Sequence, residues 1–145
     1  MRINSGAGSK TASVPHPFRE NAAQIAVRIT QCLIDNRPDI ALRHFIQLND
    51  NLVAEHGADR YALGETGPAL TGAAHWDAAI AGLVCHHLAA EGLHSPAWTD
   101  APDRFLNVPW TFNGGMYISP VDAEEVPFEF LRRGVFIGPE TLESV

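Results

Sequence analysis

The sequence lacks any apolar run near the roughly 18 residues that a membrane-spanning helix requires. Its first residues also lack the apolar core of a signal peptide. Both absences argue against a membrane or secreted protein, so we expect a cytoplasmic protein with no membrane partner. Residues 1–17, rich in Gly, Ser and Ala and closed by two prolines, are expected to form a flexible N-terminal tail.

Cysteine is scarce. The chain has two, Cys32 and Cys85, and each falls in a segment with helical patterning. In a reducing compartment such a cysteine behaves as a small apolar side chain. We therefore predict two free thiols in the core and no disulfide.

Positive charge is scarce as well. Ten basic residues stand against 17 acidic ones, which gives a net charge of -7, and Arg132–Arg133 is the only adjacent basic pair. Nucleic-acid binding normally needs a concentrated positive surface, because release of counterions from the phosphates drives it. The composition therefore predicts no direct nucleic-acid binding by this chain alone, and it favours a partner with a basic surface.

Catalytic motifs are absent too. The chain has no G-x-S-x-G turn, no H-E-x-x-H helix, no P-loop and no G-x-G-x-x-G after a strand. Cys85, His86 and His87, with His94 further on, form its most metal-like group, but adjacent helical residues point about 100° apart and cannot share one ion. We interpret them as helix-surface histidines beside a buried cysteine, and we expect no metal, no cofactor and no catalytic residues.

The first half of the chain carries the apolar patterning of helices. Apolar residues make up 46% of the 145 residues, which is typical of one globular domain. Apolar stripes predict helices near residues 19–35 and 39–56, joined by a short turn and packed as an antiparallel hairpin. Residues 58–72, with three glycines and a proline, are expected to form a loop. A third helix is predicted near residues 74–91.

The second half differs because proline recurs there every six to twelve residues, too often for long helices. Asp100 is expected to cap a short helix that runs through Leu106. Residues 110–112 and 116–118 flank an Asn-Gly-Gly sequence, which predicts a small hairpin.

Near the C-terminus, residues 127–133 predict one or two helical turns that end at Gly134. An extended piece at 135–137 and a last turn from Gly138 are expected to follow. The expected fold is therefore mainly α: a three-helix unit covered by a Pro-rich half of short helices with a minor β component. We expect it to form a single domain over residues 18–145.

Aromatic residues crowd into this second half. Short elements cannot bury so many rings alone, so the rings must pack on the three helices or on a partner. Trp76 and Trp98 are expected to be core anchors. The predicted partner-binding residues are Trp110, Phe112, Tyr117, Arg132 and Arg133.

Four short sequence segments follow one another in an order that is also found in other proteins. Trp76-Asp77-Ala78 opens a helix, and Ser95-Pro96-Ala97-Trp98-Thr99, Pro102-Asp103-Arg104-Phe105-Leu106 and Phe130-Leu131-Arg132-Arg133-Gly134-Val135-Phe136-Ile137 follow it. With this order, residues 74–145 resemble the region C-terminal to the helix-turn-helix in a group of actinobacterial XRE-type, antitoxin-like regulators. Residues 18–57 show no small-residue turn that leads into a polar recognition helix. The resemblance therefore implies the part that does not read DNA, and it brings no catalytic residues.

Three functions stay open at this point. The first is a non-catalytic, antitoxin-like module that recognises a cognate protein such as a toxin. The second is a transcription-associated regulator that acts on DNA through a partner or a small ligand. The third is a small enzyme with a site of His and carboxylate residues, among them Glu124, Glu125 and Glu129. We favour the first, because an acidic, aromatic-rich chain without catalytic motifs suits protein binding.

Overall fold

The fold is mainly helical, as predicted, in a computed structural model that describes residues 19–111 and 123–143. The predicted tail and most of the predicted hairpin lie outside these residues. In chain order the elements are α1 (Ala22–Ile34), α2 (Pro38–Ala54), α3 (Gly57–Glu65), α4 (Ala74–Ala89), the 3-10 turns η1 (Ala97–Asp100) and η2 (Pro102–Arg104), β2 (Trp110–Thr111), η3 (Ala123–Glu125), α5 (Phe128–Leu131), β3 (Val135–Phe136) and η4 (Pro139–Leu142).

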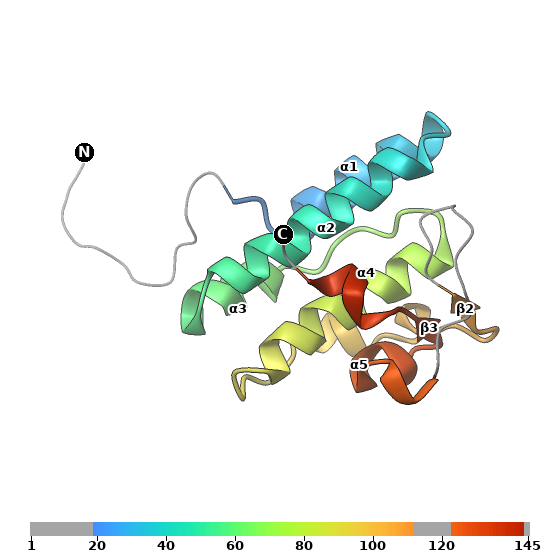
Figure 1. Cartoon of the computed structure of the whole chain (residues 1–145). Helices are drawn as coiled ribbons and strands as arrows, with labels where there is room; N and C mark the ends of the chain where they lie inside the picture. The colour runs from blue at the N-terminus through green and yellow to red at the C-terminus, as the bar shows by residue number, and fades with distance from the viewer. Residues whose placement is uncertain (1–18, 112–122, 144–145) are drawn as a thin grey trace, which may run out of the picture.

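α1 and α2 lie side by side as the predicted hairpin (Figure 1). Asn21 begins α1 with a capping box, in which its side chain accepts a bond from the Gln24 N–H and its own N–H donates to the Gln24 side chain, both at 2.9 Å. Asn36, with a φ of 57°, turns the chain, and Pro38 then begins α2. The predicted break between the two helices is therefore confirmed.

α4 runs through the centre of the fold. Figure 1 shows α1, α2 and α3 on one side of it and α5 with β3 on the other. Nearly all of its side chains are buried, which is typical of a helix that is apolar all round. At Gly82 the Phe130 ring of α5 comes so close that a Cβ would lie 2.8 Å from its Cδ1 atom. The Pro-rich half therefore covers the three-helix unit, as predicted.

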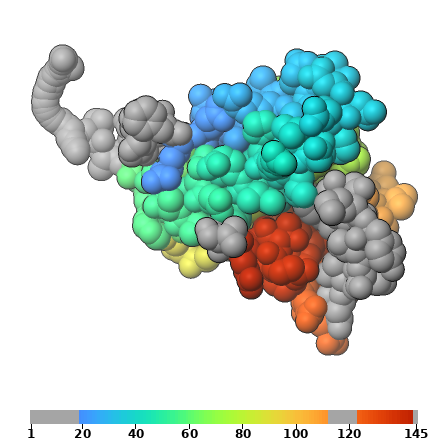
Figure 2. Space-filling view, turned by 45° about the horizontal axis from the view of Figure 1, so that its top comes forward, coloured from blue at the N-terminus to red at the C-terminus, as the bar shows by residue number. Residues whose placement is uncertain are grey.

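The minor β component is the parallel pair of β2 and β3, in which Trp110 lies opposite Val135. β3 confirms the extended piece expected at 135–137, and α5 confirms the helical turn before it. Gly134 separates them with a φ of 80°, a conformation that favours glycine. Figure 2 shows the C-terminal segment, in red, against α2, where the Asn49 side chain donates to the Leu142 carbonyl at 2.9 Å.

The prediction of a loop over residues 58–72 is wrong for its first half, because α3 occupies Gly57–Glu65. Gly64 lies inside this helix and does not break it. A Cβ there would approach the Val84 Cγ1 atom of α4 to 2.5 Å. This glycine therefore allows close packing of α3 on α4. The sequence alone does not distinguish a glycine needed for helix packing from a glycine that forms a turn.

The prediction that Asp100 caps a helix through Leu106 is also wrong. Asp100 is the last residue of η1, and a second turn, η2, begins at Pro102. A proline disfavours helical geometry in the residue before it, and Ala101 accordingly has a ψ of 144°. The proline therefore divides the segment into two short turns.

Trp76 and Trp98, the two tryptophans expected as core anchors, both contact other elements of the fold. Trp76 is 3% exposed and belongs to the core. Trp98 is half-buried, and its indole N–H donates to the Gly64 carbonyl at 2.9 Å, which ties η1 to α3. Cys32 and Cys85 are buried free thiols, as predicted.

Among the basic residues that the structure describes, three are buried and hold loops to helices. Arg60 donates to the Glu55 carbonyl at the end of α2, at 2.8 Å, and to the His87 carbonyl in α4, at 2.9 Å. Arg104 donates to the Pro68 carbonyl at 2.6 Å. The several N–H groups of a guanidinium suit this bridging. The third buried arginine, Arg133, lies beneath the candidate site.

The interpretation of His86 and His87 as helix-surface residues is wrong. His86 is half-buried, and His87 is buried with its Nε2 atom 2.6 Å from the Asn49 Oδ1 atom. Twelve of the 16 residues of α4 are buried, so the helix exposes little surface on which these side chains could face solvent. Burial, followed by the charges of His86 and Arg60, lowers the pKa of His87 from 6.5 to about 4.

Acid is expected to destabilise the protein through His87. The unfolded chain binds a proton with the ordinary pKa of 6.5, whereas the folded chain does so only near pH 4, so the free energy of unfolding falls as the pH is lowered through this window. The full loss attributable to His87 is about 3 kcal/mol. Urea unfolding between pH 7 and pH 4 measures it.

The His87→Gln variant is the matched control, because its amide N–H can reach Asn49 without titrating. It should show a shallower loss of stability between pH 6.5 and pH 4 than the natural protein. An equal dependence of stability on pH in the two proteins would show that His87 does not cause the effect. His75 and His86, whose pKa values burial also lowers, would then be its source.

Candidate partner-binding surface

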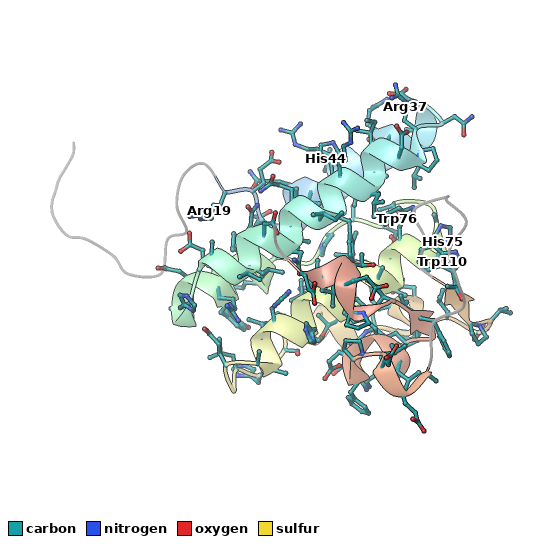
Figure 3. The ribbon with its side chains drawn as sticks, in the orientation of Figure 1. Arg19, Arg37, His44, His75, Trp76 and Trp110 are labelled. Carbon is teal, nitrogen blue, oxygen red and sulfur yellow. The ribbon has the colours of Figure 1, made fainter. Side chains whose placement is uncertain are left out.

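Trp110, the first of the predicted partner-binding residues, is half-buried in β2. Its ring centroid lies 4.4 Å from that of His75 and 6.3 Å from that of Trp76 (Figure 3). It therefore packs on the beginning of α4. Phe112 and Tyr117 lie outside the described residues.

Arg133 is fully buried. Its Nη1 atom donates to the Glu129 carbonyl and its Nη2 atom to the Thr99 carbonyl, both at 2.9 Å. A further contact of 3.4 Å joins Nη2 to the Cys85 Sγ atom. The structure therefore places Arg133 in the core, where it ties α5 to η1 and α4, and not at the surface.

Arg132 is the residue of the pair that faces solvent, with 37% of its side chain exposed. Its guanidinium carbon lies 5.1 Å from the Phe105 ring centroid and 5.9 Å from the Phe128 ring centroid. These are distances of cation–π contacts. A carboxylate oxygen of Glu129, 3.4 Å from Nη1, adds an ion pair. The guanidinium is thus held between two rings at the surface.

Two apolar side chains extend this arrangement. Phe128 is 69% exposed, and Leu131 is 37% exposed. An exposed apolar group of this size beside a fixed arginine is typical of a contact surface. We call Phe105, Phe128, Leu131 and Arg132 the α5 surface.

The helical period places these residues outward. Phe130 and Arg133 are three residues apart, so they share the face of α5 that enters the core. Phe128, Leu131 and Arg132 follow the i, i+3, i+4 spacing and therefore share the opposite face. The sequence analysis missed Phe128 and Leu131, although this spacing in residues 128–133 could have indicated them.

Carboxylates of Asp100 and Glu129 lie beside the Arg132 guanidinium of the α5 surface. Asp100, whose side chain is 69% exposed, lies 3.8 Å from Arg132. In the described part of the second half, Arg132 is the exposed basic residue, since Arg104 and Arg133 are buried. The exposed acidic residues of the same part are Asp100, Asp103, Glu124, Glu125, Glu140 and Glu143.

Two of the groups considered for catalysis or metal binding have other partners. His87 bonds to Asn49, and the Glu129 carboxylate accepts from Arg133 at 2.9 Å. Across residues 19–111 and 123–143, no three His, Cys, Asp or Glu side chains are grouped as a metal site requires. In the same residues, no helix has both the length and the apolarity needed to cross a membrane.

No family model, no curated protein and no solved structure matches this chain.

Proposed function

We propose that this protein is a non-catalytic binding module that recognises a partner protein in the cytoplasm through the α5 surface. The observation that carries the proposal is the stack in which Arg132 lies between the half-buried Phe105 and the exposed Phe128. Aromatic residues and arginine are enriched at protein interfaces, and a few such residues carry most of the binding energy. Leu131 beside the stack adds apolar area that a partner can cover.

The α5 surface is held in place before any partner arrives. The guanidinium carbon of the buried Arg133 lies 4.8 Å from the Phe105 ring centroid. The guanidinium carbon of Arg132 lies 5.1 Å from the same centroid, so the ring contacts both arginines. The Glu129 Oε1 atom pairs with both arginines, at 2.9 Å from the Arg133 Nη1 atom and 3.4 Å from the Arg132 Nη1 atom. Side chains that are already ordered lose less conformational entropy on binding.

The described second half exposes more carboxylates than basic groups, which favours a partner with basic residues around an apolar pocket. Complementary charge speeds the encounter and disfavours wrong partners. The resemblance of residues 74–145 to antitoxin-like regulators supports the same choice, a cognate protein such as a toxin. Affinity for such a partner should fall as salt is added, because exposed charges are screened.

Direct binding of DNA by this chain alone is not part of the proposal. Arg19, Arg28 and Arg37 each pair with a carboxylate at 2.5 to 3.4 Å, whereas the exposed Arg43 on α2 has no ion pair with another described residue. Figure 3 shows Arg19 and Arg37 at opposite ends of the layer formed by α1 and α2. Paired and separated cations release few counterions from a phosphate backbone.

The Phe128→Ser variant is expected to bind the partner about thirtyfold more weakly, because removal of a central interface residue typically costs about 2 kcal/mol. Its stability should stay near that of the natural protein, since the ring is 69% exposed. Calorimetric titration of the purified chain against the product of the neighbouring gene measures the affinity.

Val27→Ser is the matched control, because Val27 on α1 is 65% exposed and lies outside the α5 surface. It should leave the affinity unchanged. Equal affinities for the two variants would contradict the placement of the binding surface. Tight, sequence-specific binding of the lone chain to operon DNA at physiological salt would contradict the proposed function itself.

A further inference from the structure

A cleft of about 500 Å³ lies along α3 and shares no residue with the α5 surface. Its volume falls within the range of small-molecule sites. The residues that line it are Ala58, Tyr61, Ala62, Glu65, Leu93 and His94.

The two walls of the cleft follow from local structure. The α3 residues that line it are spaced i, i+3, i+4 and i+7, so they form one face along the whole helix. The other wall is Leu93 with His94, just after α4. Gly92, with a φ of 70°, reverses the chain there, and the Leu93 N–H donates to the Leu88 carbonyl at 2.9 Å.

Three polar contacts fix the walls relative to each other. The Glu91 carboxylate accepts from the Gly57 N–H at 2.8 Å and contacts the His56 Nδ1 atom at 2.6 Å. These bonds lower the pKa of Glu91 and attach the first residues of α3 to the end of α4. Arg60 adds its bond to the His87 carbonyl. The cleft is therefore formed without a ligand.

The lining combines an aromatic wall with an available carboxylate. The Tyr61 and His94 ring centroids are 5.7 Å apart, and the two rings are inclined by 44°. Glu65 is exposed, and its carboxylate makes no ion pair or hydrogen bond with any other described residue. It is the last residue of α3, where the helix dipole adds negative potential. The lining holds no lysine or arginine.

We infer that this cleft binds an organic cation, in which a protonated amine or guanidinium is carried on a flat apolar body. The Glu65 carboxylate pairs with the charged group. Tyr61 and His94 stack on the body, since aromatic faces attract cations and apolar rings alike. Ala58 and Ala62 leave room for the body against Leu93. Both a free aromatic amine and a peptide with a basic residue next to an aromatic one have this chemistry.

The experiment is an NMR titration of the full chain with phenethylamine, followed through amide chemical shifts. Saturable shifts are expected at Tyr61, Glu65, Leu93 and His94. Hydrocinnamate has the same ring with a carboxylate in place of the amine, and it should bind at least about tenfold more weakly. A capped Phe-Lys dipeptide is the second ligand tested. If it binds more tightly than phenethylamine, the natural ligand is a basic peptide, and if it binds more weakly, the natural ligand is a free amine.

Glu65→Gln keeps the shape of the cleft and removes its charge, so the affinity for phenethylamine should fall about tenfold. Glu125→Gln removes an exposed carboxylate on η3, outside the cleft, and should leave the affinity unchanged. Absence of saturable shifts at the lining residues would overturn the inference. Equal binding of the amine and the carboxylate would do the same, as would equal effects of the two variants.

Discussion

Replacing Arg133 with methionine is expected to lower the free energy of unfolding by about 3 kcal/mol. The methionine keeps most of the apolar stem, so the loss reports on the guanidinium. That group donates to the Thr99 and Glu129 carbonyls, both at 2.9 Å, and without it these acceptors stay buried without a donor. A loss of this size is a large part of the 5–15 kcal/mol that a small domain typically has.

Arg132→Met is the control within the same arginine pair. Its guanidinium is at the surface and its ion pair with Glu129 is 3.4 Å long, so the loss of stability should be below about 1 kcal/mol. Urea unfolding followed by tryptophan fluorescence compares the two variants. If Arg132→Met were as destabilising as Arg133→Met, the division of the pair into a buried and an exposed residue would be refuted.

Replacing Trp76 with alanine should cost about 3–5 kcal/mol. The indole is 3% exposed, and its ring centroid lies 5.9 Å from that of Phe45 in α2 and 6.3 Å from that of Trp110 in β2. Its removal leaves a cavity where the first helices meet the Pro-rich half. The thermal midpoint should fall by at least about 10 °C for a domain of this size.

Leu70→Ala gives the comparison for Trp76, because Leu70 is 50% exposed. Its midpoint should stay close to that of the natural protein, since an exposed leucine leaves no cavity when it is shortened. A Trp76→Ala variant that melts like the natural protein would show that the indole is not a core anchor.

The two arginine variants also separate folding from binding. Arg132 belongs to the α5 surface, so its replacement should weaken the partner complex while the chain stays folded. Arg133 acts through Phe105, because its guanidinium carbon lies 4.8 Å from the centroid of that ring. Its replacement is expected to change stability first and binding only through the position of that ring.

Local patterning in the sequence was sufficient for α1, α2 and α4. The apolar side chains of α1 and α2 recur with the helical period, and α4 is apolar over most of its length. The turn at Asn36 and Pro38 marks a boundary that depends on neighbouring residues alone. The same holds for α5 and β3, which Gly134 separates. Helical periodicity and turn conformation are properties of short segments, so a single sequence reveals them.

The tertiary structure alone decided what the ambiguous residues do. In the sequence Gly64 resembles a loop glycine, but in the fold it lies in a helix where a Cβ would collide with Val84. His87 resembles a surface residue in the sequence, but in the fold it is one of the buried residues of α4. Arg132 and Arg133 are adjacent and chemically identical, yet one lies at the surface and the other in the core. Burial depends on which distant segments pack together, and nothing in the identity of a residue specifies that.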